Sequence, residues 1–135
     1  QTTVEVSNNA PYASLLKRAY IMIEDSEWQK ADELLERVLD QNPECAEAYL
    51  GKLMIDLRVN KRENLATVNE PFIKYNNNYQ KIMRYCDDAL RDEMVKAYTN
   101  SVTMKKQIVR EEKVAIAWGI FFLIIFFLFV FIAAK

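Results

Sequence analysis

The chain has no histidine and contains only two glycines, three prolines and two cysteines in 135 residues. The absence of histidine excludes catalytic triads of the Ser-His-Asp type and removes the commonest metal ligand. So few glycines and prolines exclude a collagen, an all-β fold and a disordered linker protein. A formal net charge of −1 gives no sign of nucleic-acid binding. We therefore expect no metal, no cofactor, no small-molecule ligand and no nucleic acid.

The two cysteines, Cys45 and Cys86, both lie in stretches with a helical pattern. Two thiols without histidine cannot complete a four-ligand zinc site, and the chain has no CxxC motif. A disulfide would require an oxidising compartment, which the membrane topology predicted below disfavours. We therefore expect two buried, free thiols.

Composition divides the chain into three parts. Residues 1–10 are polar without a helical period and are predicted to form a disordered or extended leader. The chain begins at Gln1 rather than at methionine, so we expect a fragment or a trimmed product. Residues 11–113 have the balance of charged and apolar residues of one helical domain. Residues 114–134 are predicted to form a transmembrane helix.

Apolar residues recur at helical spacing through the middle part, which predicts an all-α fold. A first helix follows Pro11, and a second begins at Ser26 and Gln29, which match the capping-box pattern. Pro43 is predicted to open a third helix over residues 44–59. The expected core positions are Tyr12, Leu15, Leu16, Ala19, Tyr20, Ile23, Trp28, Ala31, Leu35, Val38, Leu39, Ala46, Tyr49, Leu50, Leu53 and Leu57.

The pattern is less regular over residues 64–78, where a short helix containing Leu65 is interrupted by Pro71. Three asparagines at 76–78 are typical of a turn and a helix N-cap. A break at Asp87 and Asp88 precedes a long helix without proline or glycine before the apolar run. The apolar stripe of that helix is expected to pack on the third and fifth helices as a cap: Leu90, Met94, Ala97 and Tyr98.

The run of residues 114–134 contains no ionisable side chain and holds six of the seven phenylalanines. As a helix it would be about 31 Å long, which matches a hydrocarbon core of about 30 Å. The lack of ionisable groups argues against an ion channel or a proton path. We predict one membrane-spanning helix, continuous with the helix that starts near Asp88.

Basic residues are concentrated before this run, and only Lys135 follows it. Lysine and arginine stay on the cytoplasmic side, so we predict a single-pass protein of the cell membrane with its helical domain in the cytoplasm. The lysines either contact anionic lipid or form an ordinary solvated face. The predicted membrane-interface residues are Lys105, Lys106, Arg110, Lys113 and Trp118.

Small residues mark the contact between the first two helices, Ala19 in the first and Ala31 in the second, one turn after Trp28. With this order, residues 12–43 resemble a tetratricopeptide repeat (TPR), and residues 44–59 resemble part of a second repeat. The stretch SLLKRAYIMIEDSEWQKADELLERVLDQNPECAEAYLGKLM also resembles bacterial helical-repeat proteins of unassigned function, which often carry a preceding zinc ribbon. The resemblance implies TPR-like antiparallel helix pairs with a capping helix, and a scaffold role.

Repeats of this family bind partners on the exposed concave side of their first helices. Some hold a peptide carboxylate with lysine and asparagine, but Leu16 and Tyr20 take those places here, which implies a more apolar groove. Core packing or ordinary surface remains an equal alternative for each candidate. The candidate partner-binding positions are Tyr20, Glu24, Met54 and Arg58.

These features predict a membrane-anchored TPR-like scaffold or adaptor that binds a protein or peptide partner at the cytoplasmic membrane face. The alternative is a regulatory or sensing fragment of a larger membrane protein, whose active parts, such as a zinc ribbon or further spans, lie outside this chain. An enzyme is not expected. Gly51 and Gly119 cannot form a phosphate-binding loop, and the carboxylates are spread along solvent-facing positions.

Overall fold

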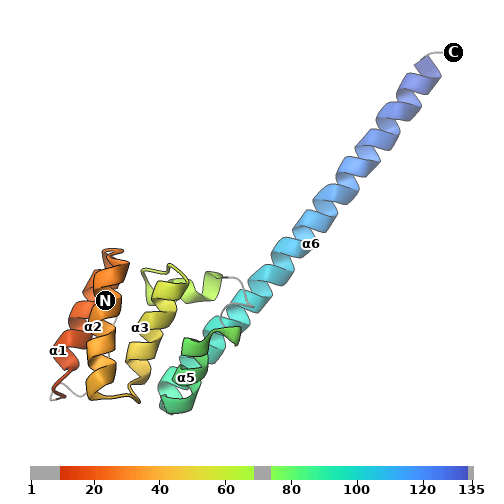
Figure 1. The fold of residues 1–135 in the computed structure, drawn as a ribbon. Coiled ribbons are helices and arrows are strands. Elements are labelled where there is room, and N and C mark those ends of the chain that lie inside the picture. Colours follow the sequence, from red (N-terminus) through yellow and green to blue (C-terminus); the bar gives the residue numbers. More distant parts are fainter. Residues whose placement is uncertain (1–9, 69–73, 134–135) are drawn as a thin grey trace. The chain divides into compact units, whose positions relative to one another are not determined.

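The structure is a computed structural model that describes residues 10–68 and 74–133. Within these ranges it is all-helical, as predicted, with several short helices followed by one long apolar helix (Figure 1). The chain forms two compact units, residues 1–102 and 103–135, with the boundary inside the last helix. The elements are α1 (Ala13–Glu24), α2 (Trp28–Gln41), α3 (Ala46–Asp56), the 3₁₀ helix η1 (Arg62–Thr67), α5 (Asn77–Tyr85) and α6 (Asp88–Ala133).

The core of the first unit is built from the apolar faces of α1, α2 and α3, which lie side by side in Figure 1. Gly51 allows α3 to approach both earlier helices closely. A Cβ atom at this position would lie 2.9 Å from Leu35 Cδ1 and 3.4 Å from Ile23 Cδ1. The small residues Ala19 and Ala31 are fully buried, in keeping with their predicted place at a helix–helix contact.

The end of α1 differs from the prediction. Ser26 has a left-handed backbone (φ 60°). Its N–H donates to the Ile23 carbonyl at 2.9 Å, and the Glu27 N–H donates to the Met22 carbonyl at 2.8 Å. These two bonds define a Schellman motif, which ends a helix. The predicted capping box of Ser26 and Gln29 is therefore wrong: Glu27 is the N-cap of α2, and its side chain makes no capping hydrogen bond.

The end of α3 repeats this geometry. Arg58 is left-handed (φ 55°), its N–H donates to the Ile55 carbonyl at 3.1 Å, and the Val59 N–H donates to the Met54 carbonyl at 2.9 Å. Glycine usually takes the left-handed position, because a Cβ there costs about 1–2 kcal/mol. The helices α1 and α3 thus end in the same motif, with a serine or an arginine in place of glycine.

The start of α3 also needs a correction. Cys45 is the N-cap of α3, so Pro43 lies in the preceding loop and not at the first helical position. The loop is held by side chains instead. The Tyr49 hydroxyl donates to the Pro43 carbonyl, and the Asn42 amide donates to the Tyr12 hydroxyl, both at 2.8 Å.

The later helix boundaries follow the predicted signals. Asn76 is the N-cap of α5, where its side-chain oxygen accepts from the N–H groups of Asn78 and Tyr79. Asp87 caps α6 by accepting from the Leu90 N–H at 2.8 Å. Leu65 lies in η1, whereas Pro71 falls outside the described residues, as does most of the predicted leader.

The first turns of α6 belong to the core of the first unit. Leu90 and Met94 are buried in the same cluster as the residues of α1–α3, and Ala97 packs against that cluster. The expected packing of Leu90, Met94 and Ala97 on the core of the helical domain is therefore confirmed, whereas Tyr98 is half-buried and is not part of that cluster. Cys45 and Cys86 are both buried and free, also as predicted. Trp28, expected in the core, is only half-buried.

Candidate functional site

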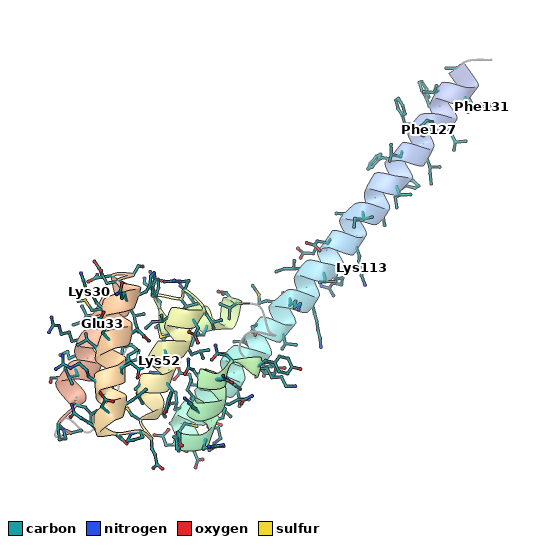
Figure 2. The ribbon with its side chains drawn as sticks, in the orientation of Figure 1. Lys30, Glu33, Lys52, Lys113, Phe127 and Phe131 are labelled. Atoms are coloured by element: carbon teal, nitrogen blue, oxygen red, sulfur yellow. The ribbon has the colours of Figure 1, made fainter. Side chains whose placement is uncertain are left out.

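The first candidate feature is the apolar part of α6, residues 114–133, in the second unit. Its large apolar side chains are all exposed, from 45% at Ile125 to 71% at Ile132. Phe127 and Phe131 are labelled in Figure 2, where their side chains project from the helix. The helix is long and apolar enough to cross a membrane, and no part of its most apolar stretch is buried. A core helix of a water-soluble domain would instead bury such side chains.

Four basic side chains lie just before this apolar segment on the same helix. Lys106, Arg110 and Lys113 are exposed, and Lys105 is half-buried. Trp118 lies inside the segment, is 57% exposed, and contacts Phe121 edge to face with 5.7 Å between ring centres. The helix therefore presents cations first and an exposed indole about one turn into the apolar segment.

The second candidate feature comprises the predicted partner-binding positions in the first unit. Tyr20 and Met54 are buried, with exposures of 5% and 1%, so these two belong to the core. Glu24 and Arg58 are exposed. Of the four candidates, only Glu24 and Arg58 present side chains that a partner could contact without a rearrangement of the core.

Tyr20 takes part in a polar network that the sequence did not reveal. Its hydroxyl donates to the backbone carbonyl of Glu47 at 2.9 Å and to the Glu47 carboxylate at 3.1 Å. The Arg62 guanidinium donates to the same carboxylate at 3.2 Å and forms a two-point pair with Glu93 of α6. Arg62 and Glu47 are 12% and 16% exposed. The network ties α1, α3, η1 and α6 together.

Burial sets the acid–base behaviour of this network. It raises the pKa of Glu47, and the nearby Arg62 charge and the Tyr20 hydrogen bond only partly oppose it. Burial and the Glu47 charge raise the pKa of Tyr20 well above its ordinary value. The Tyr20 hydroxyl and the Glu47 carboxylate are both hydrogen-bonded to other residues of the domain, so the network has a structural role.

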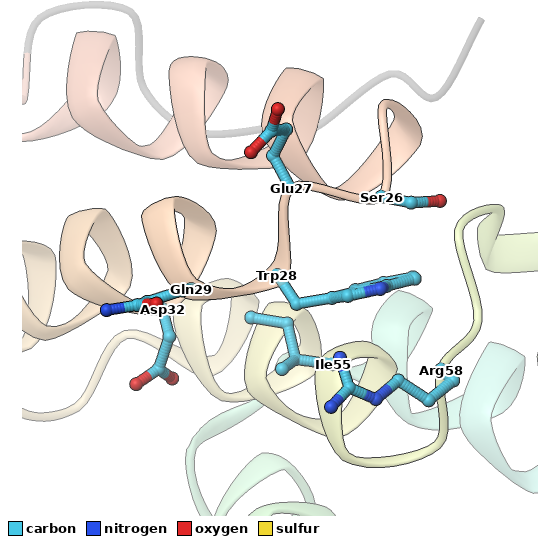
Figure 3. A pocket seen from close by; sticks show the side chains of 7 residues that line it. All are labelled: Ser26, Glu27, Trp28, Gln29, Asp32, Ile55 and Arg58. Atoms are coloured by element: carbon cyan, nitrogen blue, oxygen red, sulfur yellow. The ribbon is translucent and has the colours of Figure 1, made fainter.

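The third candidate feature is a shallow cavity of about 440 Å³ at the ends of the first helices. The Arg58 guanidinium lies 5.4 Å from the centre of the Trp28 ring, within the range of a cation–π interaction. Figure 3 shows the two side chains one above the other, with Ile55 beside them. The lining residues are Ser26, Glu27, Trp28, Gln29, Asp32, Ile55 and Arg58.

Sequence reasoning named Arg58 but not its neighbours. The sequence pattern predicts Trp28 as a core residue. The contact between Trp28 and Arg58 joins the start of α2 to the end of α3, and no local sequence pattern indicates such a contact. A left-handed arginine has no sequence marker either, because the marker of this helix ending is glycine. Across residues 10–68 and 74–133, no group of three or more acidic or cysteine side chains is placed to hold a metal ion.

Comparison of the chain with protein-family models, with curated proteins and with solved structures finds no match.

Proposed function

We propose that this protein is a membrane-anchored scaffold or adaptor, in which a TPR-like helical domain presents an interaction surface at the cytoplasmic face of the cell membrane. The observation that carries the proposal is the apolar segment of α6. Its side chains are exposed on every side, although it contains no ionisable residue from 114 to 133. Water would make such a surface costly, whereas a lipid hydrocarbon core matches it in length, at about 30 Å.

The basic residues before the apolar segment support the proposed orientation. Lys106, Arg110 and Lys113 are exposed within the last two turns or so before it. Lysine and arginine close to a membrane span are retained in the cytoplasm, and Glu111 and Glu112 count little in this effect. The helical domain would therefore lie in the cytoplasm, with Trp118 near the cytoplasmic headgroups.

The packing of α1, α2 and α3 supports a TPR-like interaction module. Fully buried alanines lie where the first two helices were expected to meet, and α1 and α3 end in the same Schellman motif at Ser26 and Arg58. Such repetition is expected of helical repeats that stack one unit on the next.

Orientation is tested by the accessibility of the basic flank to protease. The full chain is produced in bacterial cells, and trypsin is added either to intact spheroplasts or to inverted membrane vesicles. The proposal predicts cleavage near Lys105 and Lys106 in inverted vesicles and protection in spheroplasts. A Lys106→Gln, Arg110→Gln, Lys113→Gln variant should orient less uniformly. Cleavage in intact spheroplasts alone would contradict a cytoplasmic domain.

The scaffold role is tested by affinity capture of the detergent-solubilised full chain, with partners identified by mass spectrometry. A stoichiometric protein partner that is retained by the wild type and lost with surface variants of the helical domain supports the role. A partner that is retained when only the α6 apolar segment is present would place recognition in the membrane and contradict it.

A further inference from the structure

Arg58 brings a positively charged guanidinium to the lining of the cavity at the start of α2. Its guanidinium is exposed and contacts the Trp28 ring, and it forms no ion pair with any described carboxylate. Two partly buried cations of the same unit are paired: Lys52 with two carboxylates and Arg62 with two more. Among the described residues no carboxylate is paired with the Arg58 guanidinium, so its N–H donors can bind a carboxylate from outside.

The two acidic residues of the cavity are already paired with lysines. Glu27 lies 3.1 Å from the Lys30 ammonium, and Asp32 lies 2.5 Å from the Lys52 ammonium. Neither acid pairs with Arg58. Lys52 also pairs with Glu36, so the two lysines offset these charges only in part. A single further carboxylate on Arg58 meets less repulsion from the acids than a doubly charged phosphate would.

The position of the guanidinium is set by the fold. The Schellman motif fixes the backbone at Arg58, and the guanidinium carbon lies 5.4 Å from the centre of the Trp28 ring. A guanidinium has five N–H donors and binds a carboxylate by two parallel hydrogen bonds. Trp28 and Ile55 supply an apolar surface beside those donors.

We propose that this cavity binds an acidic side chain of a partner protein, with its carboxylate on Arg58 and an adjacent apolar side chain against Trp28 and Ile55. This inference rests on the proposed scaffold function and names the chemistry of its recognition. The partner segment is an acidic residue flanked by apolar residues. The site lies at the start of α2 and the end of α3, and neither Tyr20 nor Met54 lines it.

The probe is the peptide acetyl-Leu-Glu-Leu-amide, with acetyl-Leu-Gln-Leu-amide as the uncharged control and acetyl-Leu-phosphoserine-Leu-amide as the dianionic one. Binding to the full chain in nanodiscs is followed by the fluorescence of Trp28 in a Trp118→Phe background, and by the NMR signal of the Arg58 Nε–H. Saturable binding of the glutamate peptide, at least tenfold tighter than the glutamine peptide, is expected from a charge-assisted hydrogen-bonded pair.

Variants assign the effect to the cavity. Arg58→Gln should weaken the glutamate peptide at least tenfold, and Arg58→Lys should weaken it less, because it keeps the charge but loses the planar pair of donors. Arg37→Gln, an exposed arginine of α2, is the matched control and should bind like the wild type. An amide NMR spectrum checks that each variant is folded. The comparison of the peptides on the wild-type protein tests the proposal even if a variant does not fold.

Several outcomes would overturn the proposal: no binding of the glutamate peptide, equal binding of the glutamine peptide, tighter binding of the phosphoserine peptide, or full binding by Arg58→Gln. The scaffold function is judged separately by partner capture. If wild type and Arg58→Gln retain the same partner equally, the cavity is not the recognition site while the scaffold function holds; if neither retains one, the scaffold function itself fails.

Discussion

Replacing Arg62 by methionine should destabilise the helical domain more than any other single change of a charged residue. The substitution keeps an unbranched apolar stem but removes the guanidinium, which leaves the Glu47 and Glu93 carboxylates without their cation. Removing one member of a buried ion pair costs about 3–5 kcal/mol. Glu93 is 44% exposed and regains water, and Glu47 keeps its hydrogen bond from Tyr20. We therefore expect a loss of about 2–3 kcal/mol in the free energy of unfolding.

The assay is urea denaturation of the full chain in detergent, followed by the fluorescence of Trp28 in a Trp118→Phe background. The double variant with Glu47→Gln should recover about 1 kcal/mol or more, because it removes the buried charge that Arg62→Met leaves unpaired. Arg37→Met serves as a surface control and should change stability by less than about 0.5 kcal/mol. If Arg62→Met lowers the free energy of unfolding by less than about 0.5 kcal/mol, the network does not stabilise the packing of α6 on the domain.

Three further changes test other features of the domain. Ser26→Gly should raise the free energy of unfolding by up to about 1 kcal/mol by relieving the left-handed backbone, while Ser26→Ala should not; equal stabilities would refute the strain. Gly51→Val should cost about 1–3 kcal/mol, since even a Cβ would lie 2.9 Å from Leu35 Cδ1, and an unchanged melting temperature would contradict the close packing. Burial raises the pKa of Glu47, so its contribution to stability is greatest below its unfolded pKa of about 4.3 and is lost as pH rises through the folded pKa. The stability of Glu47→Gln relative to wild type should therefore increase between about pH 4 and pH 7 in urea melts, and a flat or falling difference would contradict the assignment.

Local signals were sufficient for the helical order of the chain. Asparagine at 76 and aspartate at 87 predicted helix starts because their side chains accept from free N–H groups of the first turn, and the structure has both bonds. The apolar run after Lys113 predicted a membrane-length helix from composition alone. These features depend on neighbours within one turn, which a sequence displays directly.

Features that depend on distant contacts were missed or misjudged. Ser26 was read as a cap of the following helix, because the left-handed ending of α1 depends on backbone bonds that no side chain announces. Tyr20 and Met54 are candidate partner-binding positions in the sequence but are buried in the structure, since a helical stripe does not define the width of the buried face. The role of Arg62 has no local signal, because its partners Glu47 and Glu93 come from other elements.

The account depends most directly on whether residues 114–133 cross a lipid bilayer. Nitroxide labels at Lys106, Val114, Ile120, Ile124 and Ile132 of the full chain in vesicles report the depth of each position through collisions with oxygen, which concentrates in lipid, and with a water-soluble nickel complex. A spanning helix predicts that oxygen access is greatest near Ile124 and falls toward both ends, and that the nickel complex reaches Lys106 but not Ile124. If the nickel complex reaches Ile124 as readily as Lys106, the apolar helix does not span the membrane and the anchored scaffold is wrong.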